Sequence, residues 1–434
     1  MKFLLYLLGL ASFVSLSIST ILQNGQIRQT NFLDTKVASI GLNSTGWKTY
    51  GPNATELSYK GRWDSKFISW WAAPGLKFAF EGQDVAITFG EHTSPGVLVA
   101  YRVGGLDWLF TNITAGGTHH LVSSATPGLN ATLPSQLPLT FELRVTNWVR
   151  IDLQTARHPL SLFSNNLLAK TQAYGVQISA VHISSKAKLI KIPNFAKSIE
   201  FIGDSLTSGM YATYEAFSGF GYNIGAGFGN VEFSITAYPG ICLHDANCWG
   251  NPRGQTYQWF QTSDTSSRAA QLYGTQPEPW AFNRHQSADL VLINIGTNDN
   301  NTANPVTREQ YLASYVAFIP QVHAVYPDAQ IVLMSLWGGF SATGNSFAQS
   351  GVYIDEVYQV YEHYKDAGYV HYFNSTGILQ HNDIAPQWHP TDVGHIKVAS
   401  HVMQYIRIKF GWEFAATGPE VQHETLYWND ETNY

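Results

Sequence analysis

The chain has 434 residues, a net charge of −6 and no basic run, a balance that argues against nucleic acid and anionic membranes as partners. Its length predicts two domains, because a single hydrophobic core rarely grows beyond about 250–300 residues. Aromatic residues make up 14% and charged residues only 13%, which suits a large β-rich core and, equally, a secreted protein whose aromatic faces contact sugars.

The first residues, MKFLLYLLGLASFVSLSIST, predict a secretory signal peptide over residues 1–19. Lys2 precedes an apolar run, and the small residues Ser17 and Ser19 stand at the −3 and −1 positions of a cleavage site. A membrane anchor is the alternative, but the run is shorter than the roughly 20 residues that a spanning helix needs. We therefore expect a secreted, extracellular protein.

Two further features fit export. Cys242 and Cys248 lie close together in CLHDANC, and in an oxidising compartment we expect them to form a disulfide rather than stay free or bind a metal. N-x-S/T sequences mark candidate glycosylation sites, although a chain of this length carries a few by chance. The six acceptor residues are Asn43, Asn53, Asn112, Asn130, Asn300 and Asn374.

Residues 20–185 are predicted to form an all-β sandwich of the jelly-roll kind, because short strand-like runs recur between turn residues. The clearest alternating runs are residues 76–82, 84–90, 140–148 and 175–183. Within residues 97–110, the pair Gly104-Gly105 predicts a hairpin. The pair His119-His120 is expected in a surface loop.

After Lys186 the pattern changes, and residues 186–412 are predicted to form an α/β domain with a parallel sheet between helices. Apolar runs without alternation fit strands that are buried on both faces. The runs are residues 198–203, 231–237, 290–296, 330–336 and 370–373. Residues 413–434 are typical of a polar tail.

Three helices are expected between and after these strands. A capping box of Thr307 and Gln310 predicts the start of a helix that continues to about Tyr326, and residues 353–367 form the next. The last is predicted over residues 392–410. Its buried face is expected to consist of Ile396, Ala399, Met403, Ile406 and Phe410.

Polar residues follow the predicted strands at the points where the strands end. Asp204 and Ser205 follow the first strand in FIGDSLTSG, Gly240 stands shortly after the second, and Asn298 follows the third in GTNDN. His389 precedes the last helix in QWHPTDVGH. Because ligands of such sheets bind beyond the carboxyl ends of the strands, we expect these residues to converge on one edge.

This set of residues is what acyl transfer requires. A histidine can take the proton of a serine hydroxyl and return it to the leaving group. The backbone N–H groups of Ser205 and Gly240, with the side-chain amide of Asn298, would stabilise the oxyanion of the intermediate. A helix that starts at the serine would add its dipole. Taken singly, each residue has an ordinary explanation as a helix cap, a turn residue or a packed loop histidine.

The stretches GDSLTSG, PGI, GTNDN and HPTDVGH resemble, in this order, the four sequence blocks of the GDSL-type or SGNH hydrolases. The resemblance covers most of the second half of the chain. It implies that Ser205 is the nucleophile, that His389 is the general base, and that Gly240 and Asn298 complete the oxyanion hole. His389 is preferred to His395 because the catalytic histidine of the family is commonly followed by proline; His395 is expected to have a structural role.

A β-sandwich before such a domain is similar to carbohydrate esterase family 2, whose members remove acetyl groups from plant polysaccharides such as xylan and mannan. In the first half, the resemblance rests on the strand pattern and on stretches such as WWAAPGLKFAFEG. We expect a monomer that acts on an acetylated polysaccharide or oligosaccharide without metal or cofactor. Two alternatives stay open: a GDSL-type lipase or arylesterase for non-carbohydrate esters, and a non-catalytic carbohydrate-binding protein.

One position departs from the family pattern. Many SGNH hydrolases carry an aspartate three residues before the histidine, where this chain has Pro386 in NDIAPQWHP. Asp383 could reach the histidine only if the loop folds back. We therefore expect a Ser–His dyad, or a histidine that is oriented by a backbone carbonyl.

Tryptophans near the expected cleft are candidates for stacking on a sugar, with packing in the core or at the rim as the alternative. These residues are Trp249, Trp337 and Trp388. The expected disulfide would brace the loop that follows Gly240, or would be a surface staple only.

Overall fold

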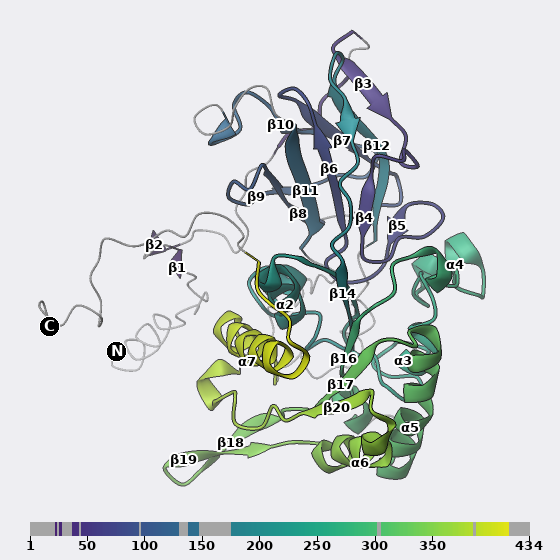
Figure 1. Cartoon of the computed structure of the whole chain (residues 1–434), viewed down its shortest axis with the longest axis vertical. Coiled ribbons are helices and arrows are strands. Elements are labelled where there is room, and N and C mark those ends of the chain that lie inside the picture. The colour runs from purple at the N-terminus through teal and green to yellow at the C-terminus, as the bar shows by residue number, and fades with distance from the viewer. Residues whose placement is uncertain are drawn as a thin grey trace, which may run out of the picture.

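The computed structural model describes residues 37–42, 45–94, 97–129, 138–146, 175–301, 305–384 and 388–415, and the backbone of β1 (Leu22–Gln23) and β2 (Gln26–Ile27). The expected signal peptide, Asn43, Asn130, Pro386 and the tail beyond residue 415 lie outside these residues. Figure 1 shows antiparallel sheets stacked on a parallel sheet that has helices on both faces. None of the described helices is both long and apolar enough to cross a membrane.

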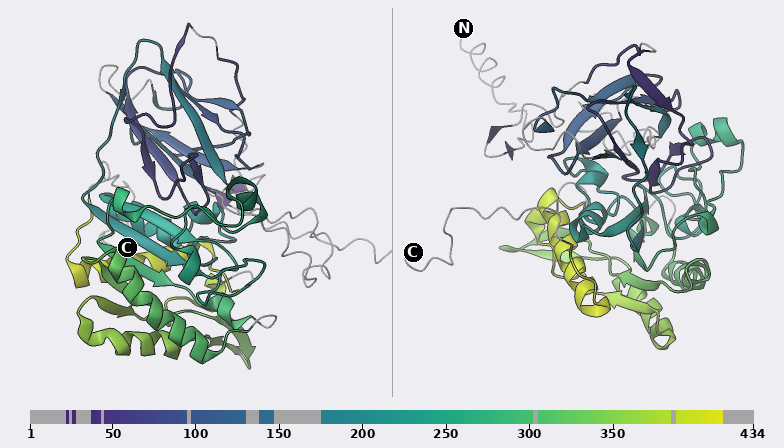
Figure 2. Two further views of the ribbon diagram at one scale, coloured as in Figure 1. Left: turned by 90° about the vertical axis from the view of Figure 1, so that its right-hand side faces the viewer. Right: turned by 45° about the horizontal axis from the view of Figure 1, so that its top comes forward.

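Two antiparallel sheets in the first half of the chain, here called the sandwich, share one apolar core (Figures 1 and 2). One has the strand order β10-β7-β12-β3 with β5 beside β12, and the other has the order β13-β6-β11-β8-β9 with β4 beside β6. The strands are β3 (Trp47–Tyr50), β4 (Ser58–Lys60), β5 (Ile68–Ser69), β6 (Gly75–Phe80), β7 (Val85–Phe89), β8 (Leu98–Val103), β9 (Leu109–Asn112), β10 (Thr118–Val122), β11 (Leu139–Val145), β12 (Val176–Ser184) and β13 (Leu189–Ile190).

The strand pattern of the sandwich follows from alternation. Leu76, Phe78 and Phe80 of β6 point into the core, because every second residue of a strand faces the same side. The expected hairpin forms between β8 and β9, and Gly104 and Gly105 adopt the left-handed conformation at its turn. His119 and His120 lie in β10, which corrects the expectation of a surface loop. The ring of His119 is buried and hydrogen-bonds to the backbone carbonyl of Val37, and that of His120 bonds to Asp84.

The second half of the chain, here called the α/β unit (residues 197–415), contains a five-stranded parallel sheet in the order β15-β14-β16-β17-β20. Its strands are β14 (Lys197–Gly203), β15 (Val231–Ala237), β16 (Leu290–Asn294), β17 (Gln330–Met334) and β20 (Val370–Phe373). An antiparallel hairpin of β18 (Gly339–Thr343) and β19 (Ser346–Ser350) projects beside it. The predicted fold class, a parallel sheet between helices preceded by antiparallel sheets, is confirmed.

Helices cover both faces of the parallel sheet (Figure 1). They are α2 (Phe220–Phe228), α3 (Gln255–Gln258), α4 (Ser267–Tyr273), α5 (Arg308–Val325), α6 (Ile354–Tyr364) and α7 (Asp392–Phe410), with 3-10 turns η3 (Glu215–Phe217), η4 (Phe282–Arg284), η5 (Thr297–Asn300), η6 (Lys365–Ala367) and η7 (His381–Asp383). Helix α2 packs with α7, and α5 packs with α6. The capping box of Thr307 and Gln310 is present and opens α5.

The buried face of α7 agrees only in part with the expected one. Ala399 and Ile406 are buried as expected, but Ile396 is 58% exposed, and Gly394 and His395 are buried as well. The helix packs closely against α2, and a Cβ at position 394 would meet the backbone carbonyl of Asp383 at 2.6 Å. A small and a polar residue therefore face inward here. The apolar pattern alone does not predict this, because it places Ile396 on the buried face.

The sandwich and the α/β unit share a buried interface. Trp70 and Trp71, which follow β5, belong to the core of the α/β unit. Arg62 of the sandwich forms a buried ion pair of 2.8 Å with Glu200 of β14. The indole N–H of Trp259 donates to the same carboxylate at 2.9 Å. Separating the two charges would leave each buried without a partner, which strongly destabilises a protein. This contact therefore fixes the sandwich against the sheet.

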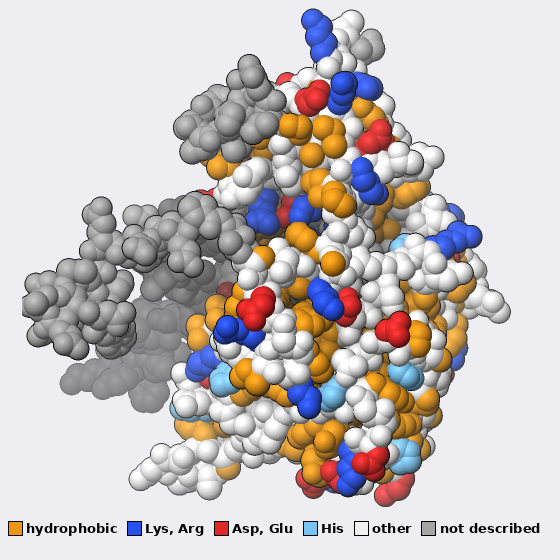
Figure 3. All heavy atoms as spheres, viewed as in Figure 1, with side chains coloured by type: hydrophobic (Ala, Val, Ile, Leu, Met, Phe, Trp, Pro, Cys, Tyr) orange, Lys and Arg blue, Asp and Glu red, His pale blue; other side chains and the backbone are white. Residues whose placement is uncertain are grey.

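The molecular surface mixes charges of both signs. In Figure 3, Lys and Arg side chains lie beside Asp and Glu side chains on the visible face, among scattered hydrophobic groups.

The four acceptor asparagines within the described residues are accessible to different degrees. Asn53, Asn300 and Asn374 are exposed, and Asn112 is half-buried.

Candidate active site

The structure brings Ser205 and His389 together at the carboxyl end of the parallel sheet. The Oγ atom of Ser205 lies 2.8 Å from Nε2 of His389, although the two residues are 184 positions apart. Ser205 stands two residues after the end of β14, and His389 precedes α7. A serine hydroxyl at hydrogen-bond distance from an imidazole is the geometry that proton abstraction requires.

The segment after β14 presents the serine by a series of turns. The backbone N–H of Ser208 donates to the carbonyl of Asp204, and that of Met210 donates to the carbonyl of Ser205. A helix does not start here, which corrects the expectation of a helix dipole at the serine. Gly209 and Tyr211 have φ values of +70° and +69°, in the left-handed region that interrupts a right-handed helix.

A glycine before the turn allows the close approach of the chain to itself. A Cβ at Gly203 would lie 2.0 Å from the hydroxyl of Thr207 and 2.9 Å from the backbone carbonyl of Asn294. Any larger residue would displace the turn and with it the hydroxyl of Ser205. The glycine of the GDSL block is therefore a steric requirement of this site.

The stretch Thr297–Asn300 (η5) holds the loop that contains Gly240. The side-chain amide of Asn298 donates to the backbone carbonyl of Ile241 at 3.0 Å. The carboxylate of Asp299 accepts the backbone N–H groups of Leu243 at 2.8 Å and His244 at 2.9 Å. An amide group has two N–H donors, so the bond to Ile241 uses one donor of Asn298.

Gly240 adopts a conformation that favours glycine, with φ of +75°. A Cβ there would lie 2.8 Å from the Cβ of Trp249 and 2.9 Å from Nδ2 of Asn251. A disulfide joins Cys242 to Cys248 across the same loop, with their Cα atoms 5.9 Å apart. The loop is therefore held at both ends, by the disulfide and by the contacts with η5.

The carboxyl groups of Asp204, which precedes the serine, and of Asp299 are both buried. Burial raises the pKa of Asp204 to about 7, while backbone N–H groups, first that of Leu206, act in the opposite direction. Burial also raises the pKa of Asp299 to about 7; the N–H groups of His244 and Leu243 oppose this shift, and the carboxyl of Asp204 adds to it. Both groups keep their protons to a higher pH than exposed carboxyl groups do.

Two residues near the histidine have structural contacts. His395 is fully buried, and its Nδ1 accepts the backbone N–H of Phe220 at 3.2 Å. Burial lowers the pKa of His395 to about 3, so its ring stays neutral. The carboxylate of Asp383 accepts two hydrogen bonds from Nζ of Lys397, at 2.8 and 2.9 Å. The loop does fold back, because the N–H of Thr391 donates to the carbonyl of Asp383, but this carboxylate is engaged by the lysine.

The three candidate tryptophans lie in different surroundings. Trp388 and Trp249 are 44% and 42% exposed and flank His389 and Gly240 respectively. Trp337 is only 2% exposed and its ring packs edge-on against Phe220. Its expected role in sugar stacking is therefore wrong, because no face of the indole is open to a ligand.

Tyr211 was not singled out from the sequence, yet its ring contacts the histidine. The rings of Tyr211 and His389 meet edge to face with centroids 5.0 Å apart. Asp299, which fixes the glycine loop, lies in the same GTNDN stretch as Asn298. Its place beside Asn298 is a usable signal, whereas the contact of Tyr211 depends on tertiary packing alone.

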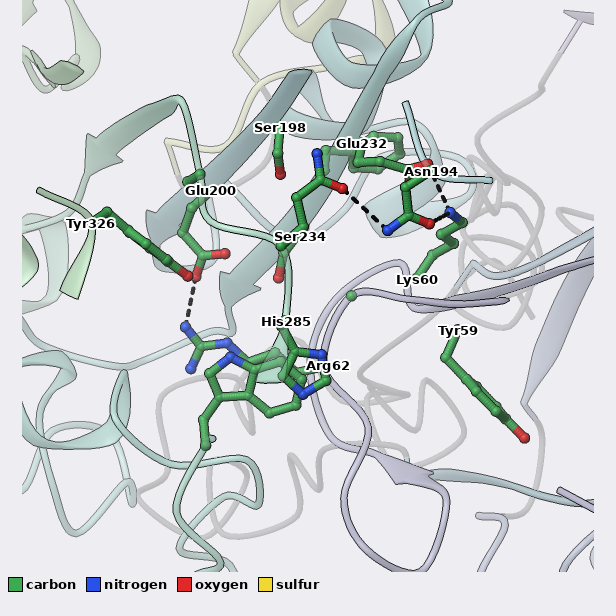
Figure 4. A pocket seen from close by; sticks show the side chains of 15 residues that line it. Tyr59, Lys60, Arg62, Asn194, Ser198, Glu200, Glu232, Ser234, His285 and Tyr326 are labelled. Carbon is green, nitrogen blue, oxygen red and sulfur yellow. Dashed lines mark hydrogen bonds and ion pairs between the residues drawn. The ribbon is translucent and has the colours of Figure 1, made fainter. Parts of the chain in front are cut away.

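A polar cavity of ≈ 90 Å³ lies elsewhere, between the sandwich and the α/β unit (Figure 4). Its lining includes Ser198 near the amino end of β14, whereas Ser205 follows the carboxyl end of that strand. The ion pair of Lys60 and Glu232, with 2.7 Å between its charged atoms, joins the two units at its wall. The cavity belongs to the interface and not to the serine site.

Among the described residues, no three His, Cys, Asp or Glu side chains gather as a metal-binding group.

Residues 201–396 match the GDSL-like Lipase/Acylhydrolase family. The matched residues include the serine, glycine, asparagine and histidine stretches in the expected order along the chain. The chain therefore contains a GDSL-like lipase/acylhydrolase domain.

Known proteins resemble the chain beyond this domain. The chain is 24% identical over 270 residues to the acetylxylan esterase / glucomannan deacetylase of Cellvibrio japonicus (strain Ueda107). The aligned part covers 56% of this chain and 68% of that protein. The structure of a family two carbohydrate esterase from Clostridium thermocellum in complex with cellohexaose has a TM-score of 0.61 and 19% identity, over 82% of this chain and 99% of that one. A family two carbohydrate esterase from Cellvibrio japonicus has a TM-score of 0.62 and 15% identity, over 84% and 98% of the two chains. The shared fold includes the sandwich.

Proposed function

We propose that the protein is a secreted serine esterase that removes O-acetyl groups from plant cell-wall polysaccharides of the xylan or mannan type. The observation that carries this proposal is the 2.8 Å contact between Oγ of Ser205 and Nε2 of His389. The resemblance to the family supports the roles of Gly240 and Asn298 in the oxyanion hole, and the amide of Asn298 holds the glycine loop. The likeness to the acetylxylan esterase / glucomannan deacetylase supports the substrate class.

The reaction follows from this arrangement. Oγ of Ser205 attacks the carbonyl carbon of the acetyl group while Nε2 of His389 takes the hydroxyl proton. The N–H groups of Ser205 and Gly240 and the amide of Asn298 donate to the oxyanion. The C–O bond to the sugar then breaks, and the imidazolium gives its proton to the sugar oxygen. Water attacks the acetyl-serine with the same histidine as base, releases acetate and restores the serine.

We infer that Asp383 is not the group that orients His389 in its work with Ser205. The support is that Lys397 occupies the carboxylate of Asp383. A backbone carbonyl can fix the tautomer and orientation of the ring, although it stabilises the imidazolium less than a carboxylate does. An Asp383→Asn variant should then keep its pH profile for kcat and lose only stability.

The second candidate is a lipase or arylesterase of the same superfamily, which the family match also supports. The two exposed tryptophans, Trp388 next to His389 in the chain and Trp249 against Gly240, favour a sugar over an acyl chain, because aromatic faces stack on pyranose rings. Comparing acetate release from acetylated xylan and glucomannan with hydrolysis of long-chain esters separates the two. Faster turnover of long-chain esters would reject the carbohydrate assignment.

The nucleophile is tested with Ser205→Ala. This variant should release no acetate and still bind the polysaccharide, because only Oγ is removed. Ser234→Ala is the matched control, since the hydroxyl of Ser234 has no hydrogen-bond partner within the described part of the chain and lies away from the site. An unchanged rate in Ser205→Ala would reject the assignment.

We further infer that residues 1–19 direct secretion and that the mature chain acts as a monomer. The composition and the expected signal peptide support the first point. Terminal sequencing of the exported protein and its mass in solution test both points. Retention of residues 1–19, or a stable dimer, would overturn the respective inference.

A further inference from the structure

The hairpin of β8 and β9 buries both of its faces. Val99, Tyr101 and Val103 point into the core of the sandwich. The alternate residues Leu98 and Ala100 are also buried, on the outer face, where an isolated sandwich would carry polar side chains. The outer face is therefore covered by another part of the molecule.

The segment that covers this face is residues 211–217, which follows the serine turn. The ring of Tyr214 stacks on Phe110 of β9 with centroids 4.3 Å apart and an interplanar angle of 12°. Phe217 packs edge-on against Phe110 and Trp108, at 5.8 and 5.1 Å. We call this group, with Leu98 and Ala100, the hairpin cluster. Stacked aromatic pairs contribute about 0.5–1.5 kcal/mol beyond their buried area.

The same segment reaches the catalytic histidine at its other end. Tyr211 contacts the ring of His389 edge to face, and the backbone N–H of Thr213 donates to Oδ1 of Asp392 at 2.8 Å. Asp392 is the first residue of α7, three positions after the histidine. Residues 211–217 thus connect β9 to His389 and to the start of α7.

The backbone of this segment needs external support. Tyr211 has φ of +69° and Glu215 has φ of +46°. Such conformations cost about 1–3 kcal/mol each for residues other than glycine, and they persist only where the surroundings hold them. The hairpin cluster on one side and the contacts with Asp392 and His389 on the other supply that support.

We propose that the β8–β9 hairpin of the sandwich positions the catalytic histidine through residues 211–217, with Phe110 and Tyr214 as positioning residues. This proposal rests on the assignment of His389 as the base. Tyr211, held by the hairpin cluster, limits the rotation of the imidazole ring and keeps Nε2 within reach of Ser205. The sandwich is then part of the catalytic apparatus rather than a separate binding module.

The expected effect is on kcat. A displacement of about 1 Å at a reacting group can cost about a hundredfold in rate, so a partial loosening in Phe110→Ala should lower kcat by about tenfold or more. KM for a small acetyl ester should change little, since Phe110 is not among the residues proposed to contact the substrate. The pH at which kcat/KM is half-maximal should move, because the environment of the base changes.

Phe89→Ala provides the matched control. Phe89 is a fully buried phenylalanine of β7 in the sandwich core, away from the hairpin cluster. Both variants should unfold at lower temperature, and only Phe110→Ala should lose kcat and shift the pH profile. Phe110→Leu keeps the apolar volume and serves if Phe110→Ala does not fold; it should show the same change to a smaller degree.

A double-mutant cycle tests the connection itself. If Phe110 acts through Tyr211, the losses of kcat in Phe110→Ala and Tyr211→Ala should be clearly non-additive. Additive losses, or equal kcat in Phe110→Ala and Phe89→Ala, would overturn the proposal. Full activity in His389→Ala would instead overturn the proposed function, so that the two failures are distinguishable.

Discussion

The side-chain amide of Asn298 donates a hydrogen bond of 3.0 Å to the backbone carbonyl of Ile241, the residue that follows Gly240. One N–H of the amide thus fixes the position of the other relative to the glycine loop. Two parts of the proposed oxyanion hole, which come from different strand ends, are joined by a direct contact. Preorganised donors of this kind need no rearrangement when charge develops on the substrate.

Asn298→Ala should lower kcat by about 10²–10³, as expected for the loss of one oxyanion donor. KM for a small acetyl ester should change much less, because the bond strengthens in the transition state. Steady-state kinetics with such an ester measures both quantities.

Asn251→Ala is a suitable comparison for this substitution. The amide of Asn251 also donates to the glycine loop, to the carbonyl of Pro239 at 3.0 Å, but it is not an expected oxyanion donor. Its loss of kcat should stay below about tenfold. Equal losses in the two variants would mean that Asn298 acts only by supporting the loop.

Asp299→Asn should destabilise the glycine loop. The amide offers one oxygen in place of two, so one of the N–H groups of Leu243 and His244 loses its acceptor, at a cost of about 1–3 kcal/mol. The loop also carries Gly240, so kcat should fall as well, by about tenfold. Urea unfolding and ester kinetics on the same sample test both effects.

Asp289→Asn is the matched control at the opposite end of the sheet. The carboxylate of Asp289 also accepts a backbone N–H, that of Ser198, at 2.8 Å. This variant should lose stability and keep its kcat. If Asp289→Asn and Asp299→Asn reduce kcat alike, the role of Asp299 at the glycine loop is refuted.

Features that depend on local sequence were predictable. Helix α5 starts at the capping box of Thr307 and Gln310, and α7 ends at Gly411, which adopts the left-handed conformation. The strands of the parallel sheet were predictable because each is a short apolar run between turns. The meeting of Ser205 and His389 was expected from their places beyond the predicted strands and from the order of the family blocks.

Features that depend on tertiary packing were not predictable. Trp337 follows a buried strand, and its side chain is itself buried in the core. The neighbouring residues in the sequence give no sign of this burial. The turns after Ser205 replace a helix because Gly209 and Tyr211 adopt positive φ values, and the ring of Tyr211 contacts His389, which is distant in sequence. Contacts of this kind arise between distant segments and leave no periodic signal.

Trp388→Ala should weaken the binding of polysaccharide more than that of small esters. The indole lies against the backbone of Gly339, and 44% of the residue is exposed beside His389. Loss of an aromatic contact of about 0.5–1.5 kcal/mol predicts a rise in KM of roughly two- to twelvefold for acetylated xylan. Trp388→Phe should restore much of this loss. Equal changes in KM for xylan and for a small acetyl ester would argue against sugar stacking.

Glu142 predicts a specific dependence of stability on pH. Burial acts to raise its pKa, but the guanidinium groups of Arg144 and Arg102 outweigh burial and lower the pKa from 4.5 to about 2. Because the folded pKa lies below the ordinary value, the stabilisation is present above about pH 4.5 and is lost as the pH falls toward 2. Its upper limit is about 3 kcal/mol.

Glu142→Gln should therefore reduce the free energy of unfolding at pH 7 and have a much smaller effect near pH 2.5. The substitution removes only the charge of Glu142. The difference in the free energy of unfolding between wild type and variant must therefore shrink as the wild-type carboxylate takes up its proton. Urea unfolding at several pH values measures this difference. The exposed residue Glu91 provides the control. The free energy of unfolding of Glu91→Gln should follow that of the wild type in parallel across the pH range. A gap between wild type and Glu142→Gln that stays constant from pH 7 to pH 2.5 would show that the two arginines do not hold this carboxylate in its charged form.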